Sequence, residues 1–480
     1  MTPQSGEVPP PGTPRPSVPQ AASLQSVRFA LDEASRAAKR IEDGAERAVI
    51  LARVAVLRWR TGDAPGCTST LATALAGARN IEDDSARALS LARIARAQAQ
   101  TGDRQGWRAT AAEALASITP GLADEVRLSA LAELALAEAT GGDFTGASAH
   151  AEQLTDGRKR DRTLGAIVSL ATSAGTFAPA LGAARATNDI DKRTHCLASI
   201  ARTQGEAGDA AGVTASVVEA LRTARMLADG FDRTVHLTAI TRVQVATGDR
   251  QGAARTVAEA LTAARGAEDN SDRVFALAHI ARNQQRLGNL MDPELLLAEA
   301  LRAARRIDGD GCLASALCEL ANVKAWAGDR VGALDLIAEA TAAAKRDAAD
   351  DGYDWHAGDI AEAQAMAGDT VAARTIARRL AREGGNDGWL ANICDALCCG
   401  DAVGEAVATA HDIESARARS QTLVQVAAHQ ARGGDPDGAA RTGGLALAAA
   451  RAIADSADRA AAFVEIADME LAIAAGRSLS

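Results

Sequence analysis

Apolar residues recur along most of this chain with the spacing of a helix that buries one face. In one segment, Leu91, Ile94, Ala95 and Gln98 follow one another at intervals of three, one and three residues. This is the stripe of an amphipathic helix. The same positions are filled in two later segments, by Leu237, Ile240, Thr241 and Gln244 and by Leu277, Ile280, Ala281 and Gln284. The pattern therefore predicts a helix that returns many times along the chain.

Each of these stripes ends at a glycine that is usually followed by aspartate. The glycines are Gly62, Gly102, Gly142, Gly175, Gly208, Gly248, Gly288, Gly328, Gly368, Gly400 and Gly434. Glycine can adopt the left-handed conformation that ends one helix, and aspartate can cap the next helix by accepting from its free N–H groups. The glycines therefore predict eleven helix–turn–helix units, each with a first helix before the turn and a second helix after it.

A second aspartate marks the junction between one unit and the next. It stands at Asp43, Asp83, Asp156, Asp189, Asp229, Asp269 and Asp455, each followed four residues later by arginine, which we expect to reach back to the aspartate. From turn glycine to junction aspartate the count is 21 in long units, as from Gly62 to Asp83, and 14 in short ones, as from Gly142 to Asp156. Since the first helices keep a constant length, the seven residues are expected to be missing from the second helix, where they make about two turns.

These markers resemble those of the tetratricopeptide repeat. That family is similar in its Gly-Asp turn, in large residues eleven and eight before the glycine, in a small residue seven before it, and in alanines five and twelve after it. Around Gly248 the corresponding residues are Leu237, Ile240, Thr241, Ala253 and Ala260. The resemblance extends over roughly residues 22–474. Two departures are that no proline closes each repeat and that the long units exceed the usual length of about 34 residues.

The resemblance implies an all-α fold, a right-handed α-solenoid of about eleven helix–turn–helix repeats with N- and C-terminal capping helices. We assign residues 21–475 to this single repeat domain. Residues 1–20 hold seven of the twelve prolines, so we expect a disordered tail there, and residues 476–480 are expected to form a flexible C-terminus. Residues 22–41 are expected to be a lone second-type helix that starts the stack, and the helix after Asp455 a cap that ends it.

Charge and cysteine content narrow the classes of partner. The formal net charge is −10, which opposes nucleic acid as the main partner because phosphate contacts need a basic surface. The seven cysteines are irregularly spaced, which is typical of reduced thiols rather than of a disulfide framework. No signal-like segment and no apolar run of membrane-spanning length is found. We therefore expect a cytoplasmic protein with no membrane partner.

Sequence motifs for catalysis or cofactor binding are absent. The patterns GxxxxGK[ST], HExxH, GxSxG and CxxC do not occur. Cys394, Cys398 and Cys399 fall on one predicted helix with His411 in the following element, but packed free thiols explain this group better than a metal site does. We therefore expect no cofactor, no metal and no enzymatic activity.

The best functional signal lies in the first helices. In the family that this chain resembles they line a concave groove, and the residues thirteen, ten, six, three and two before the turn glycine face it. Six before the glycine stand Arg96, Arg202, Arg242, Arg282, Asn322 and Glu362. Arginine can bind both oxygens of a carboxylate at once, so the arginines form a candidate site for an acidic segment. The alternative left open is that they pair with carboxylates of neighbouring helices.

Tryptophans map to the same wall. Trp59, Trp326 and Trp355 occupy groove positions, either as anchors for a peptide or as side chains that fill gaps between alanine-rich helices. The sequence therefore predicts a non-enzymatic protein-binding scaffold or adaptor whose groove holds a partner peptide or segment, in particular an acidic one. A ligand-sensing repeat domain of a regulatory system is the second interpretation.

Overall fold

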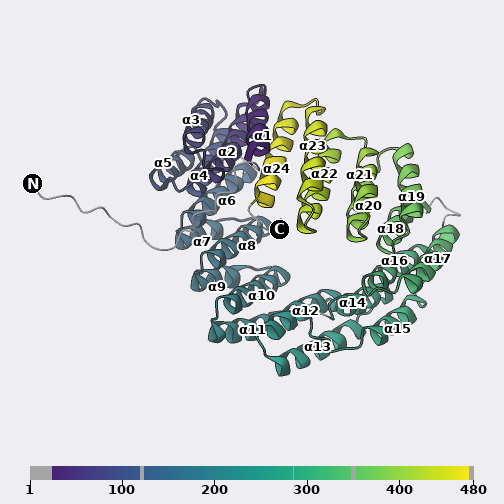
Figure 1. The fold of residues 1–480 in the computed structure, drawn as a ribbon. Helices are drawn as coiled ribbons and strands as arrows, with labels where there is room; N and C mark the ends of the chain where they lie inside the picture. Colours follow the sequence, from purple (N-terminus) through teal and green to yellow (C-terminus); the bar gives the residue numbers. More distant parts are fainter. Residues whose placement is uncertain (1–23, 119–123, 285, 348–352, 475–480) are drawn as a thin grey trace, which may run out of the picture.

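The structure is a computed structural model that describes residues 24–118, 124–284, 286–347 and 353–474, with the backbone alone at residues 24 and 353–355. Within these ranges it contains 24 helices, α1 to α24, and no strand (Figure 1). The predicted tail, residues 1–20, and the predicted flexible C-terminus, residues 476–480, lie outside the described residues. The all-α fold class is confirmed.

The even-numbered helices are the predicted first helices. They are α2 (Gly44–Arg60), α4 (Asp84–Gln100), α6 (Asp124–Thr140), α8 (Gly157–Ser173), α10 (Ile190–Glu206), α12 (Gly230–Ala246), α14 (Asn270–Arg282), α16 (Asp310–Trp326), α18 (Tyr353–Met366), α20 (Asp387–Cys399), α22 (Ala416–Arg432) and α24 (Ser456–Ala474). They contact one another in sequence and lie on the inner side of the array, and we call their exposed side the inner wall (Figure 1).

The odd-numbered helices are the second helices and lie on the outer side. They are α1 (Leu24–Ala38), α3 (Ala64–Arg79), α5 (Arg104–Ala116), α7 (Phe144–Glu152), α9 (Phe177–Ala186), α11 (Ala210–Ala224), α13 (Arg250–Arg265), α15 (Pro293–Ala304), α17 (Arg330–Asp347), α19 (Thr370–Glu383), α21 (Val403–His411) and α23 (Pro436–Arg451). From α2 to α23 they complete eleven hairpins, which confirms the α-solenoid. The helices α7 and α9 of the short units have 9 and 10 residues, against 16 in α3, so the missing residues do come from the second helix.

The turn has the predicted mechanism. Gly62 adopts φ +80°, and the Asp63 carboxylate accepts from the backbone N–H of Gly66 at 2.9 Å. A Cβ on Gly66 would lie 2.0 Å from that carboxylate, which explains why a glycine follows three residues after most of these aspartates. The turn at Gly400 differs, because Gly400 has φ −86° and Asp401 takes the left-handed conformation with φ +60°.

The junction differs from the prediction in one contact. Asp83 caps α4 by accepting from the backbone N–H of Ala86 at 2.6 Å, but Arg87 donates to the carbonyl oxygen of Ile81 at 2.8 Å instead of reaching Asp83. Equivalent bonds to carbonyl oxygens in the segment that follows the preceding second helix are donated by Arg47, Arg193, Arg233 and Arg273. The predicted arginine–aspartate contact is therefore wrong at these junctions. The reason is that these carbonyls lie between two helices, where no intrahelical N–H can donate to them, so the arginine satisfies an otherwise unpaired acceptor.

The two ends of the array pack against each other. Among the described helices, α1 has the place of a second helix and α24 that of a first helix, and the two lie side by side in the manner of a twelfth hairpin (Figure 1). A continuous hydrophobic core joins α1–α6 to α18–α24 and includes Val27, Leu31, Phe463 and Ile466. The solenoid is therefore a closed ring. The two terminal helices cap the array by covering each other, because the apolar face of each packs on the other.

Polar contacts also cross this seam between the chain ends. Arg60 on α2 forms an ion pair with Asp468 on α24, and the guanidinium of Arg451 lies 4.9 Å from the ring centre of Phe29 on α1. The spacing of the repeat markers agrees with this packing. A turn glycine is expected 19 residues after Asp455, at residue 474, and 21 residues before Asp43, at residue 22. The same count thus gives residues 474 and 22 the same place in the repeat.

A ladder of ion pairs connects successive second helices on the outer side. The pairs are 34 residues apart and include Arg79–Glu113, Arg185–Glu219, Arg225–Glu259 and Arg265–Glu299, with N···O distances of 2.6–2.8 Å. Hydrogen bonds from the arginines lower the pKa of these glutamates. Because the arginine side chains are about half exposed, each pair adds little stability, and the ladder acts mainly to hold adjacent second helices in register.

Closure predicts that the position of the termini is not essential. In a circular permutant, a new Gly-Asp pair would replace residues 474 and 23 and join residue 473 to residue 24. The new chain termini would lie between Gly384 and Gly385. We expect this permutant to fold into the same ring, with a helical circular dichroism spectrum and a melting temperature within a few degrees of the parent. A chain that lacks residues 1–41 exposes the apolar face of α24 and should melt well below both. A permutant that fails to fold would contradict closure.

The repeat core predicts a local response to a cavity. Ile240 is fully buried, so Ile240→Ala should destabilise its hairpin by about 2–5 kcal/mol. Hydrogen exchange should accelerate first in α12 and its neighbours, because repeats contact only adjacent units. Val331→Ala is the control, since Val331 is 73% exposed. Equal acceleration in all helices would argue against a modular array.

Candidate functional site

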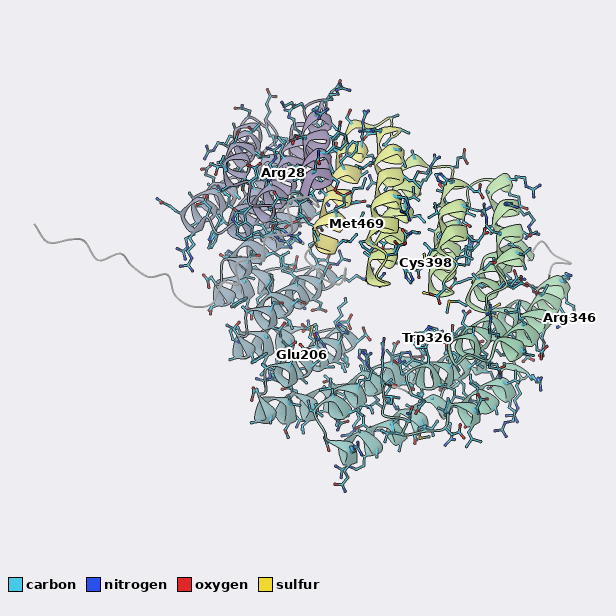
Figure 2. All side chains as sticks on the ribbon, viewed as in Figure 1. Arg28, Glu206, Trp326, Arg346, Cys398 and Met469 are labelled. Carbon is cyan, nitrogen blue, oxygen red and sulfur yellow. The ribbon has the colours of Figure 1, made fainter. Side chains whose placement is uncertain are left out.

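The inner wall contains a cavity of about 730 Å³ between α10 and α12, with Arg286 at its edge. From α10 it is lined by His195, Ala198, Ser199, Arg202, Gly205 and Glu206, from α12 by Ala239, Arg242, Val243 and Ala246, and from the C-cap of α12 by Thr247. The residues from α10 include those thirteen, ten, six, three and two before Gly208. Figure 2 shows Glu206 on the part of the ring that carries this wall. The structure thus brings Arg202 and Arg242 together in one cavity.

Arginines outnumber carboxylates in this cavity. Arg202 pairs with Glu206 on its own helix at 2.5 Å. Neither Arg242 nor Arg286 has an ion pair or hydrogen bond with any residue that the structure describes. Burial lowers the pKa of Arg242, and the positive charges of Arg286 and Arg202 lower it further. Three guanidinium groups therefore face one carboxylate, and a negatively charged group placed among them would relieve their mutual repulsion.

The remaining arginines of the candidate site, those six before the turn glycine in other repeats, are paired. Arg282 forms an ion pair with Glu319 on α16 at 2.6 Å, and Arg96 with Glu133 on α6 at 3.2 Å. In both pairs the glutamate lies 37 residues after the arginine, nine before the next turn glycine. For these two residues the alternative of intramolecular pairing describes the structure.

The residue at this position also explains why neither Arg202 nor Arg242 is paired with a glutamate of the next repeat. The residue nine before the next turn glycine is Ala239 in the unit after Arg202 and His279 in the unit after Arg242. Alanine offers no acceptor. Burial lowers the pKa of His279, and Arg282 and Arg242 lower it further. An imidazole carries no negative charge in either protonation state, so it leaves the charge of Arg242 uncompensated. The residue nine before the next turn glycine therefore decides whether the arginine is paired, and the arginine positions alone could not show this.

The other predicted site residues lie further around the ring. Asn322 on α16 is partly buried, and its side-chain oxygen has no hydrogen-bond partner among the described residues. Trp326 at the end of α16 is 54% exposed and lies at the inner edge of the ring (Figure 2). Trp355 belongs to α18, but its side chain lies outside the described part. Trp59 is 38% exposed.

Acidic residues follow the basic stretch along the inner wall. Glu319, Asp359, Glu362 and Asp395 lie on α16, α18 and α20 and interact electrostatically. Burial raises the pKa of Glu362 to about 6, and the charges of Asp359, Glu319 and Asp395 contribute to the rise. The position six before the turn glycine thus changes from arginine on α10–α14 to Asn322 and then to a carboxyl group on α18. The inner wall is divided into a basic and an acidic stretch.

The cysteine group has the character of packed thiols. Cys394 and Cys398 are buried, and Cys399 is exposed. Burial raises the pKa of the Cys398 thiol to about 12, so it is not a ready thiolate ligand or nucleophile. Among the described residues no group of three or more His, Cys, Asp or Glu side chains is arranged to hold a metal ion. In the same ranges no helix is long and apolar enough to cross a membrane.

The raised pKa of Glu362 predicts a pH-dependent stability. Between pH of about 4.5 and 6 the folded chain retains a proton that the unfolded chain has released, so stability falls as the pH rises through this window. Glu362→Gln removes this loss, and the variant should melt above the parent at pH 7.5 but together with it near pH 4. Glu152→Gln on the exposed surface is the control. A variant that melts below the parent at pH 7.5 would show that the Glu362 carboxylate is stabilising.

Comparisons with known proteins give distant similarities. No protein-family model matches the chain, and no curated protein matches it. Ton1535 from Thermococcus onnurineus NA1 is 16% identical, with 71% of this chain and 99% of that chain covered at a TM-score of 0.30. A Rap protein complexed with competence and sporulation factor is 13% identical, with 70% and 96% covered at 0.26. A circular tandem repeat protein with novel repeat topology is 14% identical, with 95% and 99% covered at 0.18. The fold assignment therefore rests on the helices of this chain themselves.

Proposed function

We propose that this protein is a non-enzymatic binding scaffold of the tetratricopeptide-like kind whose inner wall binds an acidic segment of a partner protein. The observation that carries the proposal is the cavity between α10 and α12, where Arg242 and Arg286 have no counter-charge among the described residues. Elsewhere on the wall the same arginine position is neutralised by a glutamate of the next repeat, as in Arg282–Glu319. The unneutralised arginines therefore form the part of the wall best suited to an external carboxylate.

The cavity also suits the rest of a peptide. Between the arginines it is lined by small apolar side chains, including Ala198, Ala239, Val243 and Ala246, which can contact the aliphatic part of a glutamate or a neighbouring residue. Arg202, Arg242 and Arg286 are exposed, so an acidic segment can reach all three from solvent. A local excess of positive charge can attract an acidic segment to a protein of net charge −10, because the field depends on where the charges lie.

A longer segment would reach Trp326. This side chain lies on α16, the next inner helix after α14, and is 54% exposed. Large aromatic side chains contribute disproportionately to binding when a partner covers them. We therefore include Trp326 as an anchor, with the acidic part of the segment on α10 and α12.

A ligand-sensing repeat domain is a second candidate function. The inner-wall cavities of about 540 and 730 Å³ fall within the usual range for small-molecule sites. A peptide-binding wall and a small-molecule site are compatible in one ring.

Charge reversal in the cavity tests the scaffold proposal. Arg202→Glu, Arg242→Glu and Arg286→Glu in combination should weaken binding of a fluorescein-labelled decaglutamate peptide by more than about tenfold, equivalent to about 1.4 kcal/mol. Fluorescence anisotropy would measure the affinity, which should also fall with added salt. The melting temperature should change little, because two of the three arginines have no partner to lose.

A matched control carries the same charge change on the outer helices, with Arg222→Glu, Arg255→Glu and Arg302→Glu. It should bind the peptide nearly as the parent does. If both triple variants lose binding equally, the attraction is non-specific. If the cavity variant binds normally, the acidic segment does not bind at this cavity.

A further inference from the structure

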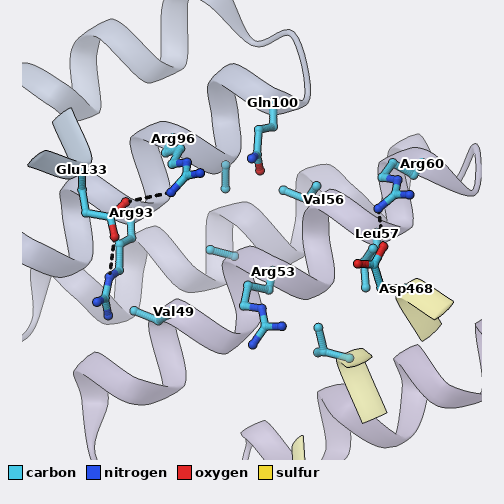
Figure 3. Close-up of a pocket in the computed structure, with 13 residues that line it drawn as sticks. Val49, Arg53, Val56, Leu57, Arg60, Arg93, Arg96, Gln100, Glu133 and Asp468 are labelled. Atoms are coloured by element: carbon cyan, nitrogen blue, oxygen red, sulfur yellow. Dashed lines mark hydrogen bonds and ion pairs between the residues drawn. The ribbon is translucent and has the colours of Figure 1, made fainter. Parts of the chain in front are cut away.

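A second cavity lies at the seam where the ends of the chain meet. It has a volume of about 540 Å³ and is lined by residues of α2, α4, α6 and α24 (Figure 3). α2 and α24 are adjacent in space, although their lining residues Arg60 and Asp468 lie 408 positions apart in the sequence. The cavity therefore exists in this form only while the ring is closed.

This seam cavity contains more positive than negative charge. It is lined by four arginines, Arg53, Arg60, Arg93 and Arg96, and by two carboxylates, Glu133 and Asp468. Glu133 is shared by Arg93 and Arg96 at 3.2 Å each, and Asp468 pairs with Arg60. The ion pairs drawn in Figure 3 therefore leave a formal excess of two positive charges.

Arg53 is the side chain that this arrangement leaves without a partner. It forms no ion pair or hydrogen bond with any residue in the described ranges, and Figure 3 shows it among the cavity residues with no interaction drawn. The Nε of Arg96 is buried and also has no hydrogen-bond partner there. A buried polar hydrogen such as that of the Arg96 Nε is normally satisfied by a partner. The Arg53 side chain is exposed, so a ligand can reach it from solvent. Both groups are donors, so an acceptor that carries negative charge would suit them.

The apolar part of the lining limits what such a ligand can be. Val49, Val56, Leu57 and Val464 contribute hydrocarbon surface beside the arginines. A bare inorganic anion would leave this surface uncovered, whereas an organic anion would place its charged group by Arg53 and its apolar body against the valines. Cavities of this size that combine apolar walls with a few polar groups are typical of small-molecule sites.

We propose that the seam cavity binds a small organic anion, with a carboxylate or phosphate head group and an apolar body, and that the bound anion holds the ring closed. The ligand contacts α2 and α4 on one side of the seam and α24 on the other. Opening the seam separates these residues and removes the site. A ligand that binds the closed ring alone stabilises it by mass action. This site is separate from the cavity around Arg242 and does not depend on the binding of an acidic segment there.

Titration calorimetry on the full chain tests the site with three matched probes. Phenylbutyrate carries a carboxylate head, phenylbutyl phosphate carries a phosphate head, and phenylbutanol has the same body without charge. We expect at least one anion to bind with a dissociation constant below about 1 mM and the alcohol to bind at least tenfold more weakly. The comparison of the two anions distinguishes the head groups. Failure of both anions to bind at millimolar concentration would overturn the proposal.

Two substitutions locate the binding. Arg53→Gln should weaken binding of the anion by about tenfold or more and leave the melting temperature of the free protein unchanged, since Arg53 has no partner to lose. Arg53→Lys should retain part of the affinity, and Arg255→Gln on the outer helix α13 should retain all of it. Unchanged binding by Arg53→Gln would place the anion elsewhere and overturn the assignment.

Hydrogen exchange tests the effect on closure. The anion should slow exchange of backbone amides in α1, α2 and α24, which form the seam, and leave α10 and α12 unaffected. The same measurement on Arg53→Gln should show no slowing at equal anion concentration. Slowing confined to α10 and α12, or none at all despite binding, would contradict the coupling between this cavity and closure.

Discussion

The structure depends on one constraint, that no hairpin of this array can cover its own apolar faces. Each hairpin needs a neighbour on both sides, and the two helices at the chain ends have only one neighbour in sequence. In an open solenoid the apolar residues of α1 and α24, such as Leu31 and Phe463, would be exposed on the terminal faces. In the ring they share one core with the helices on either side. Closure is thus the general packing rule of the array applied to its two ends.

Much of this fold could be predicted from the sequence because the turns are local. The positive φ of Gly62 and the capping bond of Asp63 involve neighbouring residues, and the constant counts between markers fix the helices. Closure is not local. The arithmetic identifies residues 22–41 and the helix after Asp455 as unpaired halves of a hairpin, but whether they meet depends on the small rotation between successive repeats, summed over eleven hairpins. That rotation is set by packing between second helices of different length and is not visible in the repeat markers.

The candidate site shows the same division between local and non-local information. The position six before the turn glycine correctly indicated side chains on the inner wall, including Arg202 and Arg242. It could not say which arginines are neutralised, because that depends on a residue in the next repeat. Where that residue is Glu319 the arginine is paired, and where it is Ala239 or His279 that position supplies no negative charge. Arg286 was missed because α14 ends early, at Arg282, and the segment after it brings Arg286 to the cavity.

The net charge of the chain therefore says little about its inner wall. The negative total is distributed so that one stretch, on α10 and α12, has unneutralised arginines. The next stretch, on α16 to α20, has carboxyl groups, and burial together with their mutual repulsion raises the pKa of Glu362. Because the ring is closed, these two stretches cannot separate as they could in a flexible open solenoid. A segment with acidic residues followed by basic residues would match the wall in one direction and meet like charges in the other. The order of charges along the repeats would thus favour one direction of a bound chain over the opposite direction.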